Sequence, residues 1–177
     1  HVIGQLTGSQ EIGDFADMAI GAGLTMGSGA IASSARMATI AGRGVSLTTR
    51  LETNAASRLA RLEATSPKAH FFSRHGAATT IEQQYVRATT GLTPDGVMLR
   101  PVDSSRFLTH RAQLAAVERA QARFALTGER SFSFEMSEII GEGFIRGGGS
   151  WVQTTNVHAV FKNGRLHTLY PFLSPLP

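Results

Sequence analysis

The sequence predicts an α+β fold in which N-terminal helices pack on a C-terminal antiparallel β-sheet. Before Gly128, apolar residues recur mostly at helical spacing, whereas after it they alternate with polar residues as they do in strands. The dipeptide Asn163-Gly164 then separates two strand-like runs, which is a strong hairpin signal. A block of helices followed by a block of strands is typical of α+β domains.

Composition divides the chain near Pro67. Residues 1–66 carry five Arg and five acidic residues, whereas residues 67–177 carry twelve Lys or Arg and eight acidic residues, so the net charge of +4 lies in the second segment. Only Lys68 and Lys162 are lysines. Arg suits phosphate recognition better than Lys does, although a GC-rich genome would also favour Arg. We expect residues 1–66 to form one helical region and residues 67–177 to form a separate domain.

The first segment contains two different stretches. Met18 to Ala35 carries no charge and is rich in Gly and Ala. It fits a small-residue hairpin that meets a membrane transiently, but a packed helix or linker is favoured because the stretch is short and weakly apolar. Val45 to Ala64 has leucines at near-helical spacing and predicts a helix that ends before Pro67. The start at His1, with no initiator Met, suggests a fragment of a longer chain.

Three helices are expected in the second segment. Ala69 to His75 is helical in pattern, with Gly76 as its stop, and a helix capped near Thr80 should run through Ala88. A turn cluster occupies residues 91–96. Ser104 to Ala125 is interpreted as one long or broken helix that Gly128 closes. Its apolar stripe consists of Leu114, Val117, Ala120 and Phe124.

The expected strands follow the helices. They are Ser131 to Met136, Glu138 to Arg146, Trp151 to Lys162 and Arg165 to Tyr170. A two-residue turn at Asn163-Gly164 predicts that Lys162 pairs with Arg165. A regular register then pairs Phe161 with Leu166, Ala159 with Thr168 and Val157 with Tyr170, and it makes His158 and His167 diagonal neighbours.

The chain lacks the residues that several kinds of chemistry require. The chain has no Cys, which excludes disulfides and thiolate-bound metals. It also has no HExxH motif, no Walker loop and no Asp cluster, which disfavours metal-dependent hydrolysis and nucleotide triphosphate use. We therefore expect neither a metal nor another cofactor.

Metal-free RNA cleavage needs only residue types that this chain supplies. The ribose 2′-hydroxyl is the nucleophile, so the protein has to provide a base, an acid and donors for the phosphate charge. The catalytic candidates are His75 as the lead acid/base, His70 or His158 as its partner, and Thr168 and Tyr170 as donors to the scissile phosphate. The substrate-binding candidates are Arg74, Arg146, Thr154 and His167.

The stretch AHFFSRHG gathers three of these candidates. His70 and Arg74 are four residues apart and share a helix face. His75 lies near the expected helix C-terminus, where the dipole should raise its pKa and suit a general acid. The alternative is an amphipathic helix whose polar residues simply face water.

KAHFFSRHGAATTIEQQYVRAT, followed much later by KNGRLHTLYPF, resembles the barnase/EndoU/colicin E5/RelE-like ribonucleases. More narrowly, it resembles the toxin members of that superfamily that are found in phage proteins and at the C-terminal tips of contact-dependent growth inhibition effectors. The matching residues are His70, Arg74, His75, Gly76, Thr168, Tyr170 and Pro171.

The resemblance covers about residues 67–177. It implies that these residues form a metal-independent endoribonuclease and that residues 1–66 are similar to the helical entry or linker region that precedes such domains. RNA would lie on the exposed face of the sheet, the target would be cytosolic RNA, commonly tRNA, and a cognate immunity protein would block the site. We then expect the tip of a secreted or cell-surface effector that passes a membrane transiently and acts in the target-cell cytoplasm. The toxin should be monomeric and should form a 1:1 complex with an acidic immunity protein.

Two other functions stay open. Ser131 to Glu135, with a preceding Arg and Glu138 or Glu142 after it, loosely fits a toxin that consumes NAD or transfers ADP-ribose. The basic residues from Arg106 to Arg123 fit a non-catalytic module that binds nucleic acid, although such spacing is also usual for a solvated helix face.

Overall fold

The computed structural model describes the backbone of residues 31–175 and the side chains of residues 47–175. Contacts divide the chain into a unit of residues 1–40 and a compact unit of residues 41–177. The uncharged stretch Met18 to Ala35 therefore lies outside the described side chains. The elements are α1 (Ile31–Ala64), α2 (Phe71–His75), α3 (Ile81–Thr90), β1 (Ser104–Phe107), α4 (His110–Thr127), β2 (Ser131–Glu135), β3 (Gly141–Phe144), β4 (Trp151–Thr154), β5 (Asn156–Lys162) and β6 (Arg165–Pro171).

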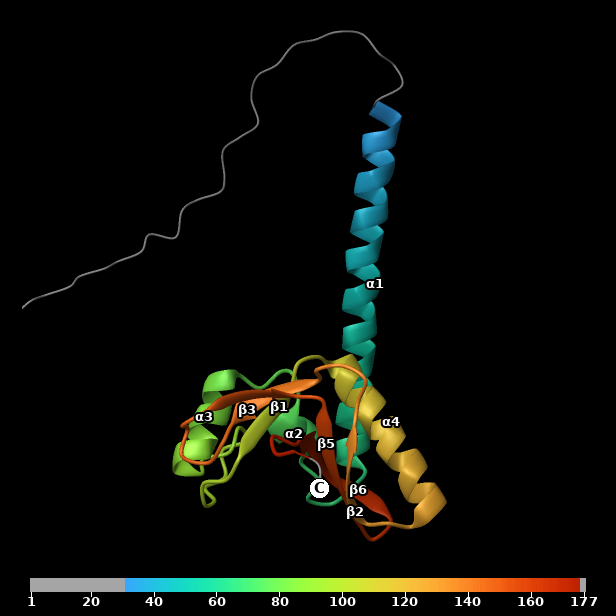
Figure 1. Ribbon diagram of the computed structural model, residues 1–177. Coiled ribbons are helices and arrows are strands. Elements are labelled where there is room, and N and C mark those ends of the chain that lie inside the picture. Colours follow the sequence, from blue (N-terminus) through green and yellow to red (C-terminus); the bar gives the residue numbers. More distant parts are fainter. Residues whose placement is uncertain (1–30, 176–177) are drawn as a thin grey trace, which may run out of the picture. The chain divides into compact units, whose positions relative to one another are not determined.

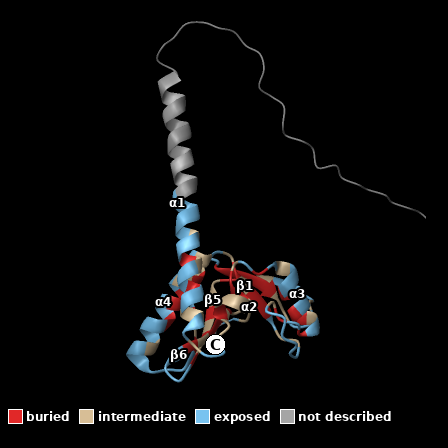
Figure 2. Ribbon diagram, turned by 180° about the vertical axis from the view of Figure 1, so that it is seen from behind, coloured by how far each residue is buried: buried red, intermediate tan, exposed pale blue. Residues whose placement is uncertain are grey.

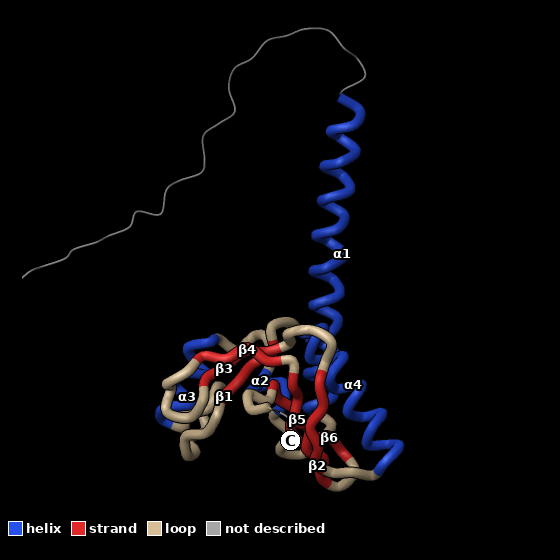
Figure 3. The backbone as a smooth tube through the Cα atoms, in the orientation of Figure 1, coloured by secondary structure: helices blue, strands red, loops and turns tan. Residues whose placement is uncertain are grey.

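The α+β class is confirmed, with two small sheets in place of one. All strand pairs are antiparallel, and the sheets have the orders β1-β3-β4 and β2-β5-β6 (Figure 3). The predicted single strand from Trp151 to Lys162 is wrong, because the chain leaves the ladder at Thr155 and passes from one sheet to the other. The hydroxyl of Thr154 stabilises this crossing, since it accepts the N–H of Asn156 at 2.9 Å and donates to the carbonyl of Phe172 at 2.8 Å.

The C-terminal part of α1 belongs to the compact unit. The helix ends at Ala64 as predicted, and Ala55 and Leu59 are buried. The carboxylate of Glu63 accepts the backbone N–H groups of Phe72 and Ser73 and so caps the start of α2. The compact unit thus begins upstream of Pro67, whereas the composition of the sequence predicted a boundary at Pro67.

Helices α2 and α3 confirm their sequence signals. Gly76 follows α2, and Thr80 begins α3 in a capping box, in which its hydroxyl accepts the N–H of Gln83 while the Gln83 side chain accepts the N–H of Thr80. Helix α3 packs against β1 and β3 (Figure 1). The buried face of α3 carries Gln84, Arg87 and Ala88.

The predicted helix from Ser104 to Ala125 is wrong over its first residues. Ser104 and Ser105 are buried in strand β1, and α4 begins only after Thr109, whose hydroxyl accepts the N–H of Ala112. Gly143 lies opposite Ser105, and a Cβ there would come within 2.1 Å of the Ser104 carbonyl oxygen. The pairing of β1 with β3 therefore depends on a glycine far along the chain, a contact that helical periodicity does not reveal.

The hairpin register is confirmed at the turn and wrong beyond it. Lys162 pairs with Arg165 and Phe161 with Leu166 as predicted, but a β-bulge between Val160 and Phe161 shifts the rest. Such a bulge adds a residue to one strand and changes which side chains share a face. The pairs that follow are Val160 with Thr168, Ala159 with Leu169, His158 with Tyr170, and Val157 with Pro171.

One hydrophobic core joins α1, α2, α4 and the β2-β5-β6 sheet (Figure 2). The ring of Phe124 on α4 stacks on that of Phe161 on β5, with centroids 4.3 Å apart. The predicted stripe on α4 is therefore its packing face. Core residues that are almost fully buried include Leu59, Phe71, Phe107, Val117, Ile140, Val157 and Leu169.

Candidate functional site

A cavity of about 350 Å³ opens where α2, α3, β1 and β6 meet. These elements are brought together because the backbone N–H of His70 donates to the carbonyl of His167 on β6, and because α3 packs on β1. The residues that line the cavity are His70, His75, Arg87, Val102, Asp103, Ser105, Thr168, Tyr170, Pro171, Phe172 and Leu173.

His75 is buried and held in one orientation. Its Nδ1 lies 2.8 Å from the carbonyl oxygen of Ser105, so Nδ1 carries the proton and Nε2 is left with a lone pair. Burial, followed by the nearby Arg87 cation, lowers the pKa of His75 well below its ordinary value. The expectation that the helix end raises this pKa is wrong, because desolvation outweighs the weak dipole of a five-residue helix. His75 is neutral at pH 7.

Arg87 is a buried cation that no carboxylate neutralises. Its Nη1 lies 3.3 Å from Nε2 of His75, and within the described side chains no acidic group comes within ion-pair distance of it. Burial, and then repulsion by Arg74, lowers the pKa of Arg87, and attraction by the Asp95 carboxylate partly offsets this effect. The guanidinium remains charged at any physiological pH. A buried charge without an ion-pair partner is costly, which favours an anionic ligand at this position.

Thr168 and Tyr170 project from β6 into the same cavity. The hydroxyl of Thr168 is buried and has no hydrogen-bond partner among residues 47–175. Tyr170 stacks on His75, with ring centroids 5.2 Å apart, and burial is the main cause that raises the pKa of its phenol. Tyr170 therefore keeps its proton at neutral pH and is able to donate it.

His70 lies at the other side of the cavity. Its Nδ1 is 3.1 Å from the carbonyl of Lys68, which leaves Nε2 as the acceptor. Partial burial is the largest cause that lowers the pKa of His70, and Arg74 and Arg87 lower it further. His70 is thus a neutral imidazole at pH 7, and its Nε2 is able to accept a proton.

Ser105 and Asp103 complete the wall on the β1 side. The hydroxyl of Ser105 donates to the carbonyl of Pro171 at 2.6 Å, which ties β1 to β6 beside His75. Asp103 is the one carboxylate among the residues that line the cavity. It accepts the backbone N–H of Arg146 at 2.8 Å.

His158 stands behind Tyr170 and outside the cavity lining. The bulge makes the two residues direct cross-strand neighbours, with ring centroids 5.4 Å apart. The imidazole nitrogens lie 3.2 Å from the hydroxyl of Ser131 and 2.8 Å from that of Ser133. His158 therefore supports the Tyr170 ring from the sheet.

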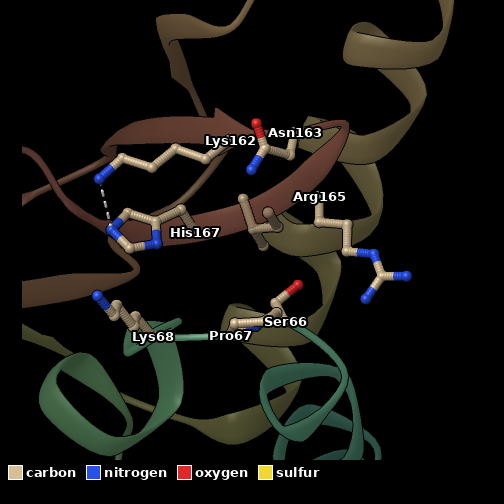
Figure 4. Close-up of a pocket in the computed structure, with 8 residues that line it drawn as sticks. Ser66, Pro67, Lys68, Lys162, Asn163, Arg165 and His167 are labelled. Atoms are coloured by element: carbon tan, nitrogen blue, oxygen red, sulfur yellow. Dashed lines mark hydrogen bonds between the residues drawn. The ribbon is translucent and has the colours of Figure 1, made fainter.

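None of the four predicted substrate-binding residues lines the cavity. Arg74 forms an ion pair with Asp95 at 2.9 Å. Arg146 is exposed in the turn between β3 and β4, and Thr154 is engaged by Phe172 and Asn156 at the crossing between the sheets. The remaining one, His167, lines a separate pocket beside the β5–β6 turn (Figure 4).

Arg87 is a cavity residue that is not among the candidates predicted from the sequence. The residue follows Gln84 by three positions and precedes Ala88 and Gly91, so it falls on the face of an amphipathic helix that packs inward. An Arg among inward positions is uncommon and marks a paired or functional charge. The helical spacing of Arg87 from Gln84 and Gly91 is the pattern in the sequence that predicts its inward position.

The residues behind the two other hypotheses are engaged elsewhere. Arg106 pairs with Glu142 at 2.6 Å, and Arg119 and Arg123 lie over the rings of Phe134 and Phe132. The Arg106 ion pair joins β1 to β3, and Arg119 and Arg123 join α4 to β2. Glu142 and Glu135 are not among the residues that line the cavity.

No cluster of three His, Asp or Glu residues in the described part of the chain has the geometry to hold a metal ion. None of the helices described there is long and apolar enough to cross a bilayer.

Comparison of the chain with protein-family models, with curated proteins and with solved structures gives no match.

Proposed function

We propose that this protein is a metal-independent endoribonuclease whose active site is the cavity at His75. The observation that carries the proposal is Arg87, a buried guanidinium that forms no ion pair with a carboxylate in the described part of the chain and lines the same cavity as the unpartnered hydroxyl of Thr168. Both groups suit a phosphodiester, because guanidinium offers a fork of donors and the hydroxyl offers one more. Two neutral imidazoles and a protonated phenol complete the set that RNA cleavage needs.

We assign the base and the acid from the protonation states that the pKa directions indicate. The lowered pKa of His70 leaves its Nε2 unprotonated, so it is the base for the 2′-hydroxyl. The raised pKa of Tyr170 keeps its phenol protonated, so it is the donor to the leaving oxygen. Nε2 of His75 faces Arg87, and His75 positions the guanidinium.

In the proposed step, the 2′-oxygen attacks the adjacent phosphorus while His70 takes the hydroxyl proton. The O2′–P bond forms and the P–O5′ bond breaks, and Tyr170 protonates the departing 5′-oxygen. Arg87 and Thr168 stabilise the charge that grows on the non-bridging oxygens, where preorganised donors contribute most. The products are a 2′,3′-cyclic phosphate and a 5′-hydroxyl, and no external nucleophile or metal is required.

The direct test is cleavage of total tRNA and of a mixed RNA oligonucleotide in EDTA, with mass spectrometry of the ends. We expect fragments with 2′,3′-cyclic phosphate, no cleavage of the matching DNA, and a loss of about 10²-fold or more in Arg87→Ala. Arg111→Ala is the matched control, because Arg111 is exposed and does not line the cavity. Intact RNA at enzyme excess would overturn the proposal.

The same preparation separates the two other hypotheses. Release of nicotinamide from NAD would favour the NAD-consuming toxin. Tight RNA binding without cleavage, unaffected by Arg87→Ala, would favour the non-catalytic module.

We further propose that the chain is the toxic tip of a contact-dependent growth inhibition effector that acts on RNA, with tRNA as the expected target, in the cytosol of a neighbouring cell. The excess positive charge in residues 67–177 supports an acidic immunity partner, because opposite charge accelerates association. Expression of the chain alone should arrest growth. We expect the protein encoded immediately downstream to be small and acidic, and its co-expression should restore growth. Normal growth without that protein would contradict this setting.

A further inference from the structure

A second pocket, of about 520 Å³, lies between the turn before α2 and the turn that joins β5 to β6 (Figure 4). Ser66, Pro67 and Lys68 line it from one side and Lys162, Arg165 and His167 from the other. None of the described residues that line this pocket is acidic, so it is a concave surface of a single charge sign.

The basic residues of this pocket are held by tight turns. Lys68 has φ of 62°, and the hairpin turn places Asn163 at 51° and Gly164 at 75°. The chain contains only two lysines, Lys68 and Lys162, and both line this one pocket. Figure 4 shows their amino groups on the side of the pocket toward His167, whereas Arg165 points the other way and donates to the carbonyl of Thr65.

Charge in the pocket is not compensated within the protein. Lys68, Lys162 and Arg165 form no ion pair with any acidic group in the described part of the chain. Nζ of Lys162 lies 2.9 Å from Nε2 of His167. Burial lowers the pKa of His167, and Lys162 and His70 lower it further. Cations gathered without an acid repel one another, and a bound anion would relieve that repulsion.

This pocket adjoins the cavity through a pair of imidazoles. The ring of His167 meets the ring of His70 edge to face, with centroids 5.0 Å apart. His70 lines the cavity, and Thr168, the residue after His167 on β6, also lines it. A strand whose scissile phosphate sits at Arg87 would therefore pass His70 to reach the second pocket.

We propose that Lys68, Lys162 and His167 form a second phosphate subsite, which binds a neighbouring phosphodiester of single-stranded RNA. This inference rests on the proposed ribonuclease function, and it states what kind of substrate that site takes: RNA that extends beyond a dinucleotide. The subsite adds affinity and sets the direction of the strand, whereas the chemistry stays in the cavity.

The test compares two substrate lengths in a matched pair of variants. The substrates are dinucleoside monophosphates, which have one phosphate, and mixed RNA octamers. Lys68→Asn with Lys162→Gln removes the two charges, and Asn tolerates the left-handed backbone at residue 68. Arg100→Ala with Arg111→Ala removes two exposed charges that lie outside both pockets. Thermal melting confirms that each variant is folded.

For octamers we expect the lysine variant to lose about tenfold in kcat/KM, and the salt slope of log kcat/KM to fall by about 0.7 for one lost phosphate contact. For dinucleotides its kcat/KM should match the unmodified protein within about twofold, and the arginine control should keep most of its activity on both substrates. An equal loss on both lengths, or no loss on octamers, would overturn the subsite.

Binding of a non-cleavable 2′-O-methyl octamer, followed by fluorescence anisotropy, separates this inference from the proposed function. If the unmodified protein cleaves no RNA, the ribonuclease proposal fails, and the anisotropy measurement still decides the subsite. Weaker binding by the lysine variant alone would support it, and equal binding by both variants would overturn it.

Discussion

At the scale of single residues, the cavity combines groups that a purely structural core avoids. Within the described side chains, Arg87 is a buried charge without an ion-pair partner, and Thr168 is a buried hydroxyl without a hydrogen-bond partner. Unpaired buried polar groups cost stability unless something else satisfies them. Such residues are expected where a ligand, rather than the protein, completes the hydrogen bonds.

Thr168 and Thr154 provide a matched pair for this argument. Both threonines are buried on strands, but the Thr154 hydroxyl has two partners whereas the Thr168 hydroxyl has none. We expect Thr154→Val to lower the free energy of unfolding by about 1–3 kcal/mol, and Thr168→Val to leave it unchanged or raise it. Urea unfolding measures both values.

Cleavage assays on the same two variants give the functional half of the comparison. Thr168→Val should lose about tenfold or more in kcat, because it lacks a donor to the phosphate. A loss of stability in Thr168→Val as large as that in Thr154→Val would show that the Thr168 hydroxyl has a hydrogen-bond partner in the folded protein.

The buried imidazole of His75 should make stability depend on pH. Its pKa in the folded protein lies well below the ordinary value, so below about pH 6.5 the unfolded chain binds a proton that the folded chain does not. The free energy of unfolding should therefore fall as pH decreases from 7.5 to 5.5, with a contribution from His75 of up to about 1.4 kcal/mol per pH unit. His75→Asn keeps a donor for Ser105 but cannot titrate.

The measurement is urea unfolding of the unmodified protein and His75→Asn at several pH values. The variant should show the shallower pH dependence, although His70, His158 and His167 also have lowered pKa values and contribute to both proteins. Parallel curves for the two proteins would show that His75 titrates normally in the fold.

At the scale of elements, the β-bulge decides which side chains of the hairpin meet. Without it, Tyr170 would pair with Val157; with it, Tyr170 pairs with His158. The bulge thus brings the Tyr170 ring between His158 and the His75 ring. A one-residue shift in a strand changes the environment of every following side chain.

Two helix ends test how strongly α3 is held in place. Gly91 after α3 and Gly128 after α4 both adopt left-handed backbone, with φ of 88° and 69°. A Cβ at Gly128 would meet nothing within 4 Å, whereas one at Gly91 would lie 1.8 Å from the carbonyl oxygen of Leu99. Gly128→Ala should cost about 1 kcal/mol of stability, and Gly91→Ala clearly more.

Thermal or urea unfolding distinguishes the two glycine variants. Gly91→Ala should also reduce cleavage, because α3 carries Arg87 and has to shift to admit the new Cβ. Equal stabilities of the two variants would mean that the loop around Leu99 yields freely and does not hold α3.

At the scale of the whole molecule, the domain does not begin where the composition changes. Leu59 of α1 is fully buried with Phe71 of α2 and Val117 of α4 in the common core. Loss of one such leucine side chain costs about 2–5 kcal/mol. The core therefore needs part of residues 1–66, the segment that was expected to be an entry or linker region.

Truncation tests this arrangement directly. A fragment of residues 41–177 should melt cooperatively, whereas one of residues 67–177 should not, because it lacks Leu59 and the Glu63 cap of α2. Circular dichroism during heating provides the measurement. In the full chain, Leu59→Ala should destabilise strongly, and Leu47→Ala, at an exposed position, should not. A cooperative transition in the shorter fragment would place the domain boundary at Pro67 after all.

Local signals in the sequence were sufficient for much of the fold and for part of the cavity. The end of α1, the Thr80 cap, the packing stripe of α4 and the Asn163-Gly164 turn each depend on residues a few positions apart, and each was predicted correctly. His70, His75, Thr168 and Tyr170 were named from residue type and from the family resemblance, and the structure places all four around one cavity.

Tertiary contacts decided the rest, because it depends on residues that are distant in the chain. Strand β1 exists because Gly143 lets β3 approach Ser104 and Ser105, and the bulge, rather than the turn, selects the partner of Tyr170. The burial of Arg87 beside His75 requires α3 to pack on β1. Short-range patterns specify where a helix or turn begins, but the charge and solvent exposure of a side chain's surroundings arise only when separate elements pack together.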